Sequence, residues 1–287
     1  MSRQRSAHRL SAFGVTVDEL LLLMRLSDVT ELGPVVLAVH PNVYRPDDQR
    51  TVDLAVLPGL LAAGLVGEDG GVDPFVRRWL HALQAPDAGI DLRVFEGDSV
   101  LRGAVVRCGE QVVVAFRYDD EVTIQGFMAD RDAFDTTVVE PLWRVLGAAE
   151  PADIESITLG AAELAGIVAT FDPSVEDRRA EREFRGRLRE FDVPESTLDV
   201  LVEASRYSGR RAELIYQRVS ESGVRVRADW ALGVMDTTAG RVLSVTARGA
   251  HGEQDVTISP GTRKRFAAGL VELVERGGAR GWLDPTD

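Results

Sequence analysis

The side chains that could carry out catalysis or hold a metal are few in this chain and far apart. There are four histidines, His8, His40, His81 and His251. No two of them have the close helical spacing that places two metal ligands on one face of a helix. Cys108 is the only cysteine, so there is no internal disulfide and no cysteine-based metal cluster. The sequence therefore predicts no catalytic residue, no metal site and no cofactor.

Two pairs of adjacent acidic residues resemble the paired carboxylates of hydrolases. They are Asp47-Asp48 and Asp119-Asp120. Adjacent side chains point in different directions on a helix or a strand, so we interpret the first pair as the start of a helix and the second as a turn. A carboxylate-dependent hydrolase of unknown substrate, whose acidic groups converge only in the folded chain, stays open as an alternative.

The most distinctive local string runs from Asp236 through Thr-Thr-Ala to Gly240 and Arg241. Asp236 can accept backbone N–H bonds across a turn, Gly240 can supply a positive φ, and Arg241 can fold back onto the carboxylate. A turn explains every residue type in the string, so we predict that these residues form a structural turn.

Composition and charge exclude several classes of protein. The chain has 287 residues, of which 45% are hydrophobic and 28% charged, as in ordinary globular proteins. Its net charge of -13 would repel a phosphate backbone, so we expect no nucleic acid partner. The apolar run at 20–24 is too short for a signal peptide, and no window approaches the roughly 20 apolar residues of a bilayer span. We expect a cytoplasmic protein that does not insert into membranes.

Helix and strand periods show one pattern twice along the chain. In the first half, a predicted helix precedes an antiparallel meander, and a second helix begins near Asp130, with Pro141 kinking it or marking its start. The first predicted helix covers 73–83, and the strands cover 90–94, 101–105, 112–118 and 122–127.

The second half repeats this order with longer strands. A helix over 194–206 is followed by strands, and then by a helix that Ser259 caps and that ends at Gly277-Gly278. The predicted strands are 212–219, 224–228, 231–236, 242–247 and 256–258, with turns at 220–223, 237–240 and 249–252. The apolar stripe of the last helix consists of Phe266, Leu270, Leu273 and Val274.

Two similar units predict an α+β fold with pseudo-twofold symmetry, in which a central antiparallel sheet is flanked by helical bundles. We expect one domain over 1–287, made of quasi-repeats at about 14–150 and 151–280, with a disordered tail at 1–12. A small-residue helix at 160–169 and a salt-bridged helix at 175–190 lie between the repeats. Whether the strands form one sheet or two packed sheets stays open.

The string at Asp236 also resembles the Asp-Thr-x-x-Gly-Arg signature in the second half of the EspG family, the ESX secretion-associated proteins of actinobacteria. The stretch at 83–86 before the first strand, the stretch at 156–159 before the helix around Leu164, and the last amphipathic helix agree with this resemblance. Length and element order match over nearly the whole chain. Thr238 stands where many relatives have proline, and the loop at 96–99, long in some members, is short here.

This resemblance implies a cytosolic chaperone of type VII (ESX) secretion. Such proteins bind the exposed hydrophobic tip of a helical PPE protein paired with its PE partner, keep the heterodimer soluble and deliver it for export. A sheet flanked by helices can cover such an aggregation-prone tip. The resemblance implies a partner-facing surface on the second half, which maps here onto Ser222, Val224, Val226, Leu232 and Val234.

Several alternatives for the partner stay open. The short loop at 96–99 leaves open whether the first half contacts a partner, and whether the client is a shorter or non-PPE helical protein. A homo-oligomeric scaffold could pair an exposed sheet face with its own copy. A free chaperone could also form a homodimer through the surface that its client would occupy.

Overall fold

The computed structural model describes residues 11–42, 45–128, 133–171, 178–206, 209–220, 222–248 and 253–277. The first half contains β1 (Ala12–Thr16), β2 (Ala88–Glu96), β3 (Ser99–Cys108), β4 (Gln111–Tyr118) and β5 (Glu121–Met128). The second half contains β6 (Ile157–Gly160), β7 (Arg211–Val219), β8 (Arg225–Thr237), β9 (Gly240–Arg248) and β10 (Gln254–Pro260).

All these strands form one antiparallel sheet, in the order β1-β5-β4-β3-β2-β7-β8-β9-β10-β6. The two meanders are joined at the centre, where β2 pairs with β7. From the edge to the centre, the strands of the first half run β1-β5-β4-β3-β2 and those of the second half run β6-β10-β9-β8-β7. In each half, the first strand along the chain lies at the edge, the last strand lies next to it, and the second strand lies at the centre. A duplicated unit would produce this order, and the duplication itself remains a prediction.

The predicted strands of the first half are confirmed by β2 to β5, whereas one break predicted in the second half is wrong. The segments 224–228 and 231–236 are a single strand, β8. Its register against β7 shifts between Ile215 and Gln217, so that Tyr216 stands opposite residues 228–230. This bulge interrupts the alternation of side chains without ending the strand, which is why the sequence suggested a break. The predicted turn at 249–252 lies outside the described residues.

The helices of the first half are α1 (Val17–Leu26), α2 (Pro46–Ala62), α3 (Pro74–Gln84) and α4 (Glu140–Val145), with a 3₁₀ turn η1 (Val35–Leu37) and a π-helical stretch η3 (Asp135–Val139). Asp47 and Asp48 lie in the first turn of α2, as predicted. Pro141 lies in the first turn of α4, directly after the wider π-helical stretch, and so marks the start of the α-helical part. Asp130 lies outside the described residues.

The helices of the second half are α5 (Ala161–Val168), α6 (Arg178–Arg189), α7 (Glu195–Ser205) and α8 (Arg263–Arg276). The prediction that Ser259 caps α8 is wrong, because Ser259 and Pro260 still pair with β9. The cap is Thr262, whose hydroxyl accepts a hydrogen bond from the N–H of Arg265 at 3.2 Å. The predicted apolar stripe of α8, which includes Phe266 and Leu270, is buried.

At the N-terminal end, β1 begins at Ala12, the last residue of the segment predicted as a disordered tail. Residues 1–10 lie outside the described part of the chain. Within the described residues, no helix combines the length and the apolar character needed to cross a bilayer.

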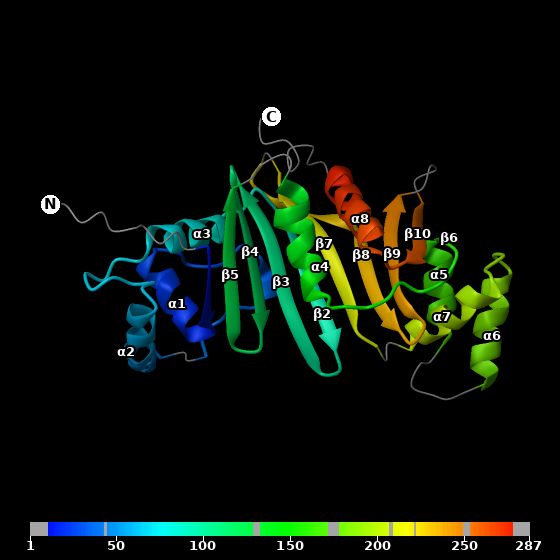
Figure 1. Cartoon of the computed structure of the whole chain (residues 1–287), viewed down its shortest axis with the longest axis horizontal. Helices are drawn as coiled ribbons and strands as arrows, with labels where there is room; N and C mark the ends of the chain where they lie inside the picture. The colour runs from blue at the N-terminus through cyan, green and yellow to red at the C-terminus, as the bar shows by residue number, and fades with distance from the viewer. Residues whose placement is uncertain are drawn as a thin grey trace.

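The helices divide between the two faces of the sheet (Figure 1). Helices α4 and α8 lie across the centre of one face, where they bury side chains of the central strands such as Leu92, Leu214 and Leu232. We call this the α4/α8 face. On the opposite face, α1 and α3 cover the first half at one end, and α5 to α7 cover the second half at the other. The middle of that opposite face, on β2 and β7, carries partly exposed side chains such as Ile215 and Gln217.

Candidate partner-binding surface

The turn between β8 and β9 places Asp236 and Arg241 directly opposite each other in the sheet. The guanidinium of Arg241 donates from Nε to Oδ1 of Asp236 at 2.6 Å and from Nη2 to Oδ2 at 2.9 Å. Gly240 has a φ of +116°, a conformation that side chains with a Cβ rarely adopt. The Arg241 side chain is 0% exposed, so its charge needs the Asp236 carboxylate beside it.

Arg241 also joins this turn to the end of the first half. Its Nη2 donates to the carbonyl of Leu146 at 2.8 Å, and its Nη1 donates to the carbonyl of Gly147 at 3.1 Å. The guanidinium stacks on Trp143 of α4, with its carbon 5.0 Å from the ring centre. These contacts make the buried Arg241 side chain an anchor between the β8–β9 turn and α4.

The described residues contain no group of three histidine, cysteine or carboxylate side chains that could hold a metal ion. Burial, assisted by the nearby Asp87, raises the pKa of the Cys108 thiol above its ordinary value, which disfavours a reactive thiolate. His8 and His251 lie outside the described residues.

The structure places the five predicted partner-facing residues in two different environments. Val224 and Val226 are 60% and 41% exposed, and Ser222 is also exposed. Leu232 and Val234 are only 0% and 2% exposed, in the core under α8. The prediction that Leu232 and Val234 face a partner does not fit this burial, because α8 covers this part of β8.

The exposed residues lie in the hairpin that joins β7 to β8. Ser222 forms a hydroxyl–hydroxyl hydrogen bond with Ser220 at 2.8 Å, and Ser220 accepts a bond from the N–H of Val224 at 3.1 Å. Ser222 therefore supports the turn, while Val224 and Val226 offer apolar surface. Val226 lines a shallow cleft of about 220 Å³ with Trp230, near the end of α8.

The opposite face of the central strands forms an open cleft of about 230 Å³, which we call the central cleft. It was not predicted from the sequence. Its floor comes from β2, β7 and the first part of β8, and one wall comes from η1. The lining residues are Val35, Val36, Asp91, Arg93, Glu213, Ile215, Gln217 and Arg227.

Asp91 is the residue of β2 that lies opposite Ile215 in this floor. Its Oδ1 accepts a hydrogen bond from Nε2 of Gln217 at 3.0 Å. Burial raises the pKa of Asp91 to about 6, although the nearby guanidinium groups of Arg225, Arg227 and Arg93 act in the opposite direction. The cleft therefore combines a partly desolvated carboxylate with several cations.

A second open cleft of about 310 Å³, which we call the η1 cleft, lies between α1 and the segment that contains η1. Leu21, Met24 and Leu32 give it apolar walls. Val35 lines both this cleft and the central cleft, and at 72% exposure it is the most exposed of the large hydrophobic side chains described. The two clefts thus meet at Val35.

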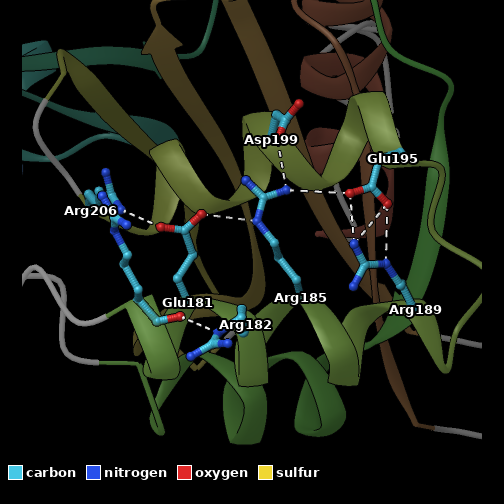
Figure 2. A network of polar contacts seen from close by, with 8 residues as sticks. Glu181, Arg182, Arg185, Arg189, Glu195, Asp199 and Arg206 are labelled. Atoms are coloured by element: carbon cyan, nitrogen blue, oxygen red, sulfur yellow. Dashed lines mark hydrogen bonds and ion pairs between the residues drawn. The ribbon is translucent and has the colours of Figure 1, made fainter.

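At the other end of the sheet, a network of ion pairs holds α6 against α7 (Figure 2). Arg185 lies 3.0 Å from Glu181 on its own helix and 2.7 Å from Asp199 on α7. Arg189 pairs with Glu195 at 2.7 Å, and Glu181 also pairs with Arg206 at 2.9 Å. The sequence predicted salt bridges within α6, and the pairs that cross to α7 were missed because they depend on how the helices pack.

Taken together, these features define an α+β protein with exposed clefts on a large antiparallel sheet. A family model described as the EspG family matches residues 16–272. The chain belongs to the EspG family, which confirms the resemblance inferred from the Asp236 string.

Individual relatives match nearly the whole chain. It is 31% identical to the ESX-3 secretion-associated protein EspG3 of Mycolicibacterium smegmatis, over 86% of this chain and 82% of that protein. It is 26% identical to the ESX-1 secretion-associated protein EspG1 of Mycobacterium tuberculosis, over 99% of this chain and 94% of that protein.

A solved structure shares the fold. It is the type VII secretion system chaperone EspG5 of Mycobacterium tuberculosis, in complex with a PE25-PPE41 dimer. The TM-score is 0.70 at 19% sequence identity, and the match covers 92% of this chain and 96% of that chain.

Proposed function

We propose that this protein is a cytosolic chaperone of type VII secretion. It binds the hydrophobic tip of a PPE-like helical client, keeps the client soluble and delivers it for export. The observation that carries this proposal is the exposed sheet surface between two groups of helices, in a chain of the EspG family. The complex of EspG5 with PE25-PPE41 supports a PE/PPE-like heterodimer as the partner.

The surface suits stoichiometric binding more than turnover. At the central cleft, Val35 and Ile215 offer exposed or half-exposed apolar side chains that a helical client can cover. The hairpin residues Val224 and Val226 offer a separate apolar surface, since Val226 lies beside Trp230 near the end of α8. A homodimer of the free protein would use the same surface and would dissociate when the client binds.

We also propose that the chain is one domain made of quasi-repeats at about 14–150 and 151–280. The strand orders β1-β5-β4-β3-β2 and β6-β10-β9-β8-β7 support this. A helix follows each edge strand, α1 after β1 and α5 after β6, and another precedes each central strand, α3 before β2 and α7 before β7. The repeats place one helical group at each end of the sheet and leave a surface at the centre.

The experiment is a co-expression assay. The tagged chain is expressed with a PE/PPE-like pair from the same genome, and the soluble fraction of the client is measured with and without it. We expect the client to be insoluble alone and soluble in a complex that carries this chain. A client that stays insoluble with every PE/PPE-like pair of that genome, while this chain elutes alone, would contradict the proposed function.

A further inference from the structure

We infer that the client segment that docks in the central cleft presents a carboxylate beside an aliphatic side chain, and that it contacts the first half of the chain at Val35. This inference rests on the proposed function. It adds the chemistry of the docking segment and extends the contact beyond the second half.

Cations without a local partner provide the first argument. Arg93 on β2 and Arg227 on β8 are both exposed at the central cleft. Neither forms a hydrogen bond or an ion pair with any of the described residues, although both attract Asp91 at longer range. Glu213 is directly opposite Arg93 in the register, yet the two side chains form no ion pair in the structure.

The chain has enough carboxylates to form ion pairs with both Arg93 and Arg227. The sequence has 46 acidic residues against 33 basic ones, so an arginine is more easily paired than an acid. Asp91 is instead hydrogen-bonded to Gln217, and Arg225 donates to the backbone carbonyl of Gly33. Guanidinium groups left open at a cleft are suited to bidentate binding of a carboxylate from another molecule.

The position of Val35 provides the second argument. One exposed valine is ordinary on a protein surface, but Val35 stands where the central cleft and the η1 cleft meet. Its segment is fixed from both sides, because the N–H of Gly33 donates to the carbonyl of Leu83 at 2.7 Å and Arg225 of the second half holds the Gly33 carbonyl. Val35 is thus a pre-positioned apolar contact, which lowers the entropic cost of binding.

A helix supplies both chemical groups at the right spacing. Side chains three or four positions apart lie on the same face of a helix, about 5–6 Å from each other. A client helix with an aliphatic residue against Val35 can therefore place a carboxylate toward Arg93 or Arg227 on the same face. Such a client helix pairs its carboxylate with Arg93 or Arg227 and covers Val35 at the same time.

The test measures how fast the client leaves the chaperone. A labelled complex of this chain with a PE/PPE-like pair is mixed with excess unlabelled wild-type chain, and exchange is followed over time. The variants are Arg227→Glu and Val35→Asp. Their matched controls are Arg144→Glu, which is exposed on α4, and Leu54→Asp, which is 65% exposed on α2.

We expect each cleft variant to dissociate about 10-fold faster or more, the usual effect of losing a central contact. Both controls should exchange at the wild-type rate, and added salt should speed the exchange of the wild type more than that of Arg227→Glu. Replacing client carboxylates by lysine should restore slow exchange to Arg227→Glu. Circular dichroism of the variants checks that each remains folded, and Arg227→Gln provides a milder change.

The outcomes separate this inference from the proposed function. If the wild-type complex forms and both cleft variants exchange at its rate, the inference is wrong and the chaperone function stands. If only Val35→Asp is impaired and salt has no effect, the client carboxylate is wrong. If the wild-type chain forms no complex with any PE/PPE-like pair, the proposed function fails and this inference fails with it.

Discussion

The buried guanidinium of Arg241 donates hydrogen bonds to the Asp236 carboxylate at 2.6 and 2.9 Å. The same guanidinium also donates to the carbonyl groups of Leu146 and Gly147. One side chain thereby connects the turn between β8 and β9 with the end of α4. The Asp-Thr-x-x-Gly-Arg string of the sequence therefore has a structural explanation at a distance from the central cleft.

Removing this guanidinium should destabilise the whole protein. Arg241→Ala would leave the Asp236 carboxylate and two carbonyl groups without their donor, and breaking a buried pair in this way typically costs about 3–5 kcal/mol. Urea unfolding followed by circular dichroism measures the loss. Arg144→Ala, which breaks a surface pair with Glu140, should cost under about 0.5 kcal/mol. Equal stability of Arg241→Ala and wild type would rule out the anchoring role.

Substitutions in the buried part of β8 and in the exposed hairpin before it should have different consequences. Leu232→Asp buries a charge under α8 and should unfold the protein or cost more than about 4 kcal/mol. Val224→Asp should leave the thermal midpoint within a few degrees of wild type and reduce the co-purified client about 10-fold, because Val224 is 60% exposed. Thermal unfolding and the pull-down are measured on the same preparations. Normal client binding by Val224→Asp and Val226→Asp together would exclude the hairpin from the partner surface.

The ion pairs between α6 and α7 should act locally. Arg185 joins Glu181 on α6 to Asp199 on α7, so Arg185→Ala should loosen α6 and speed its amide hydrogen exchange by about 3- to 10-fold. Exchange in the central strands should not change. Arg182→Ala is the control, since the Arg182 guanidinium donates only to the carbonyl of Arg178 among the described partners. Faster exchange throughout the sheet would show that the network stabilises more than α6.

Asp91 should make stability fall as the pH rises. Its pKa is about 6 in the folded protein and 3.8 as the ordinary value, so between these values the folded state binds more protons than the unfolded state. The free energy of unfolding should therefore decrease from about pH 4 to pH 6 through this group. The difference corresponds to at most about 3 kcal/mol, and solvent at the open cleft reduces it.

The substitution Asp91→Asn tests the direction of this change in the free energy of unfolding with pH. The amide keeps an acceptor for Gln217 and carries no charge, so the variant should be about 1–2 kcal/mol more stable than wild type at pH 7 and nearly equal to it at pH 4. Urea midpoints across this range measure the difference. A wild type that gains stability relative to Asp91→Asn between pH 4 and pH 6 would contradict the raised pKa.

The sequence was informative where local periodicity and packing agree. Phe266 and Leu270 recur at helical spacing, and they are buried as that spacing predicts. The turn at Gly240 and Arg241 was predictable because Arg241 pairs with Asp236, which is only five positions away in the sequence.

Features that depend on distant segments were missed. The central cleft combines Val35, Asp91 and Arg227, which meet only because β2 pairs with β7 at the centre of the sheet. The burial of Leu232 depends on α8, which follows it by some thirty residues, so its apolar character looked the same as that of the exposed Val224. A clue was present in Arg225 and Arg227, whose alternation with Val224 and Val226 indicates a strand with one charged and one apolar face.

The most direct test of the central claim is the molar mass of the complex eluted from a co-expression of this chain with a PE/PPE-like pair, measured by light scattering after size-exclusion chromatography. A stoichiometric chaperone predicts one peak whose mass is the sum of one copy of this 31.3 kDa chain and one copy of each client subunit. A peak at the mass of this chain or its homodimer, with all client subunits in the insoluble fraction for every pair tried, would contradict the chaperone account.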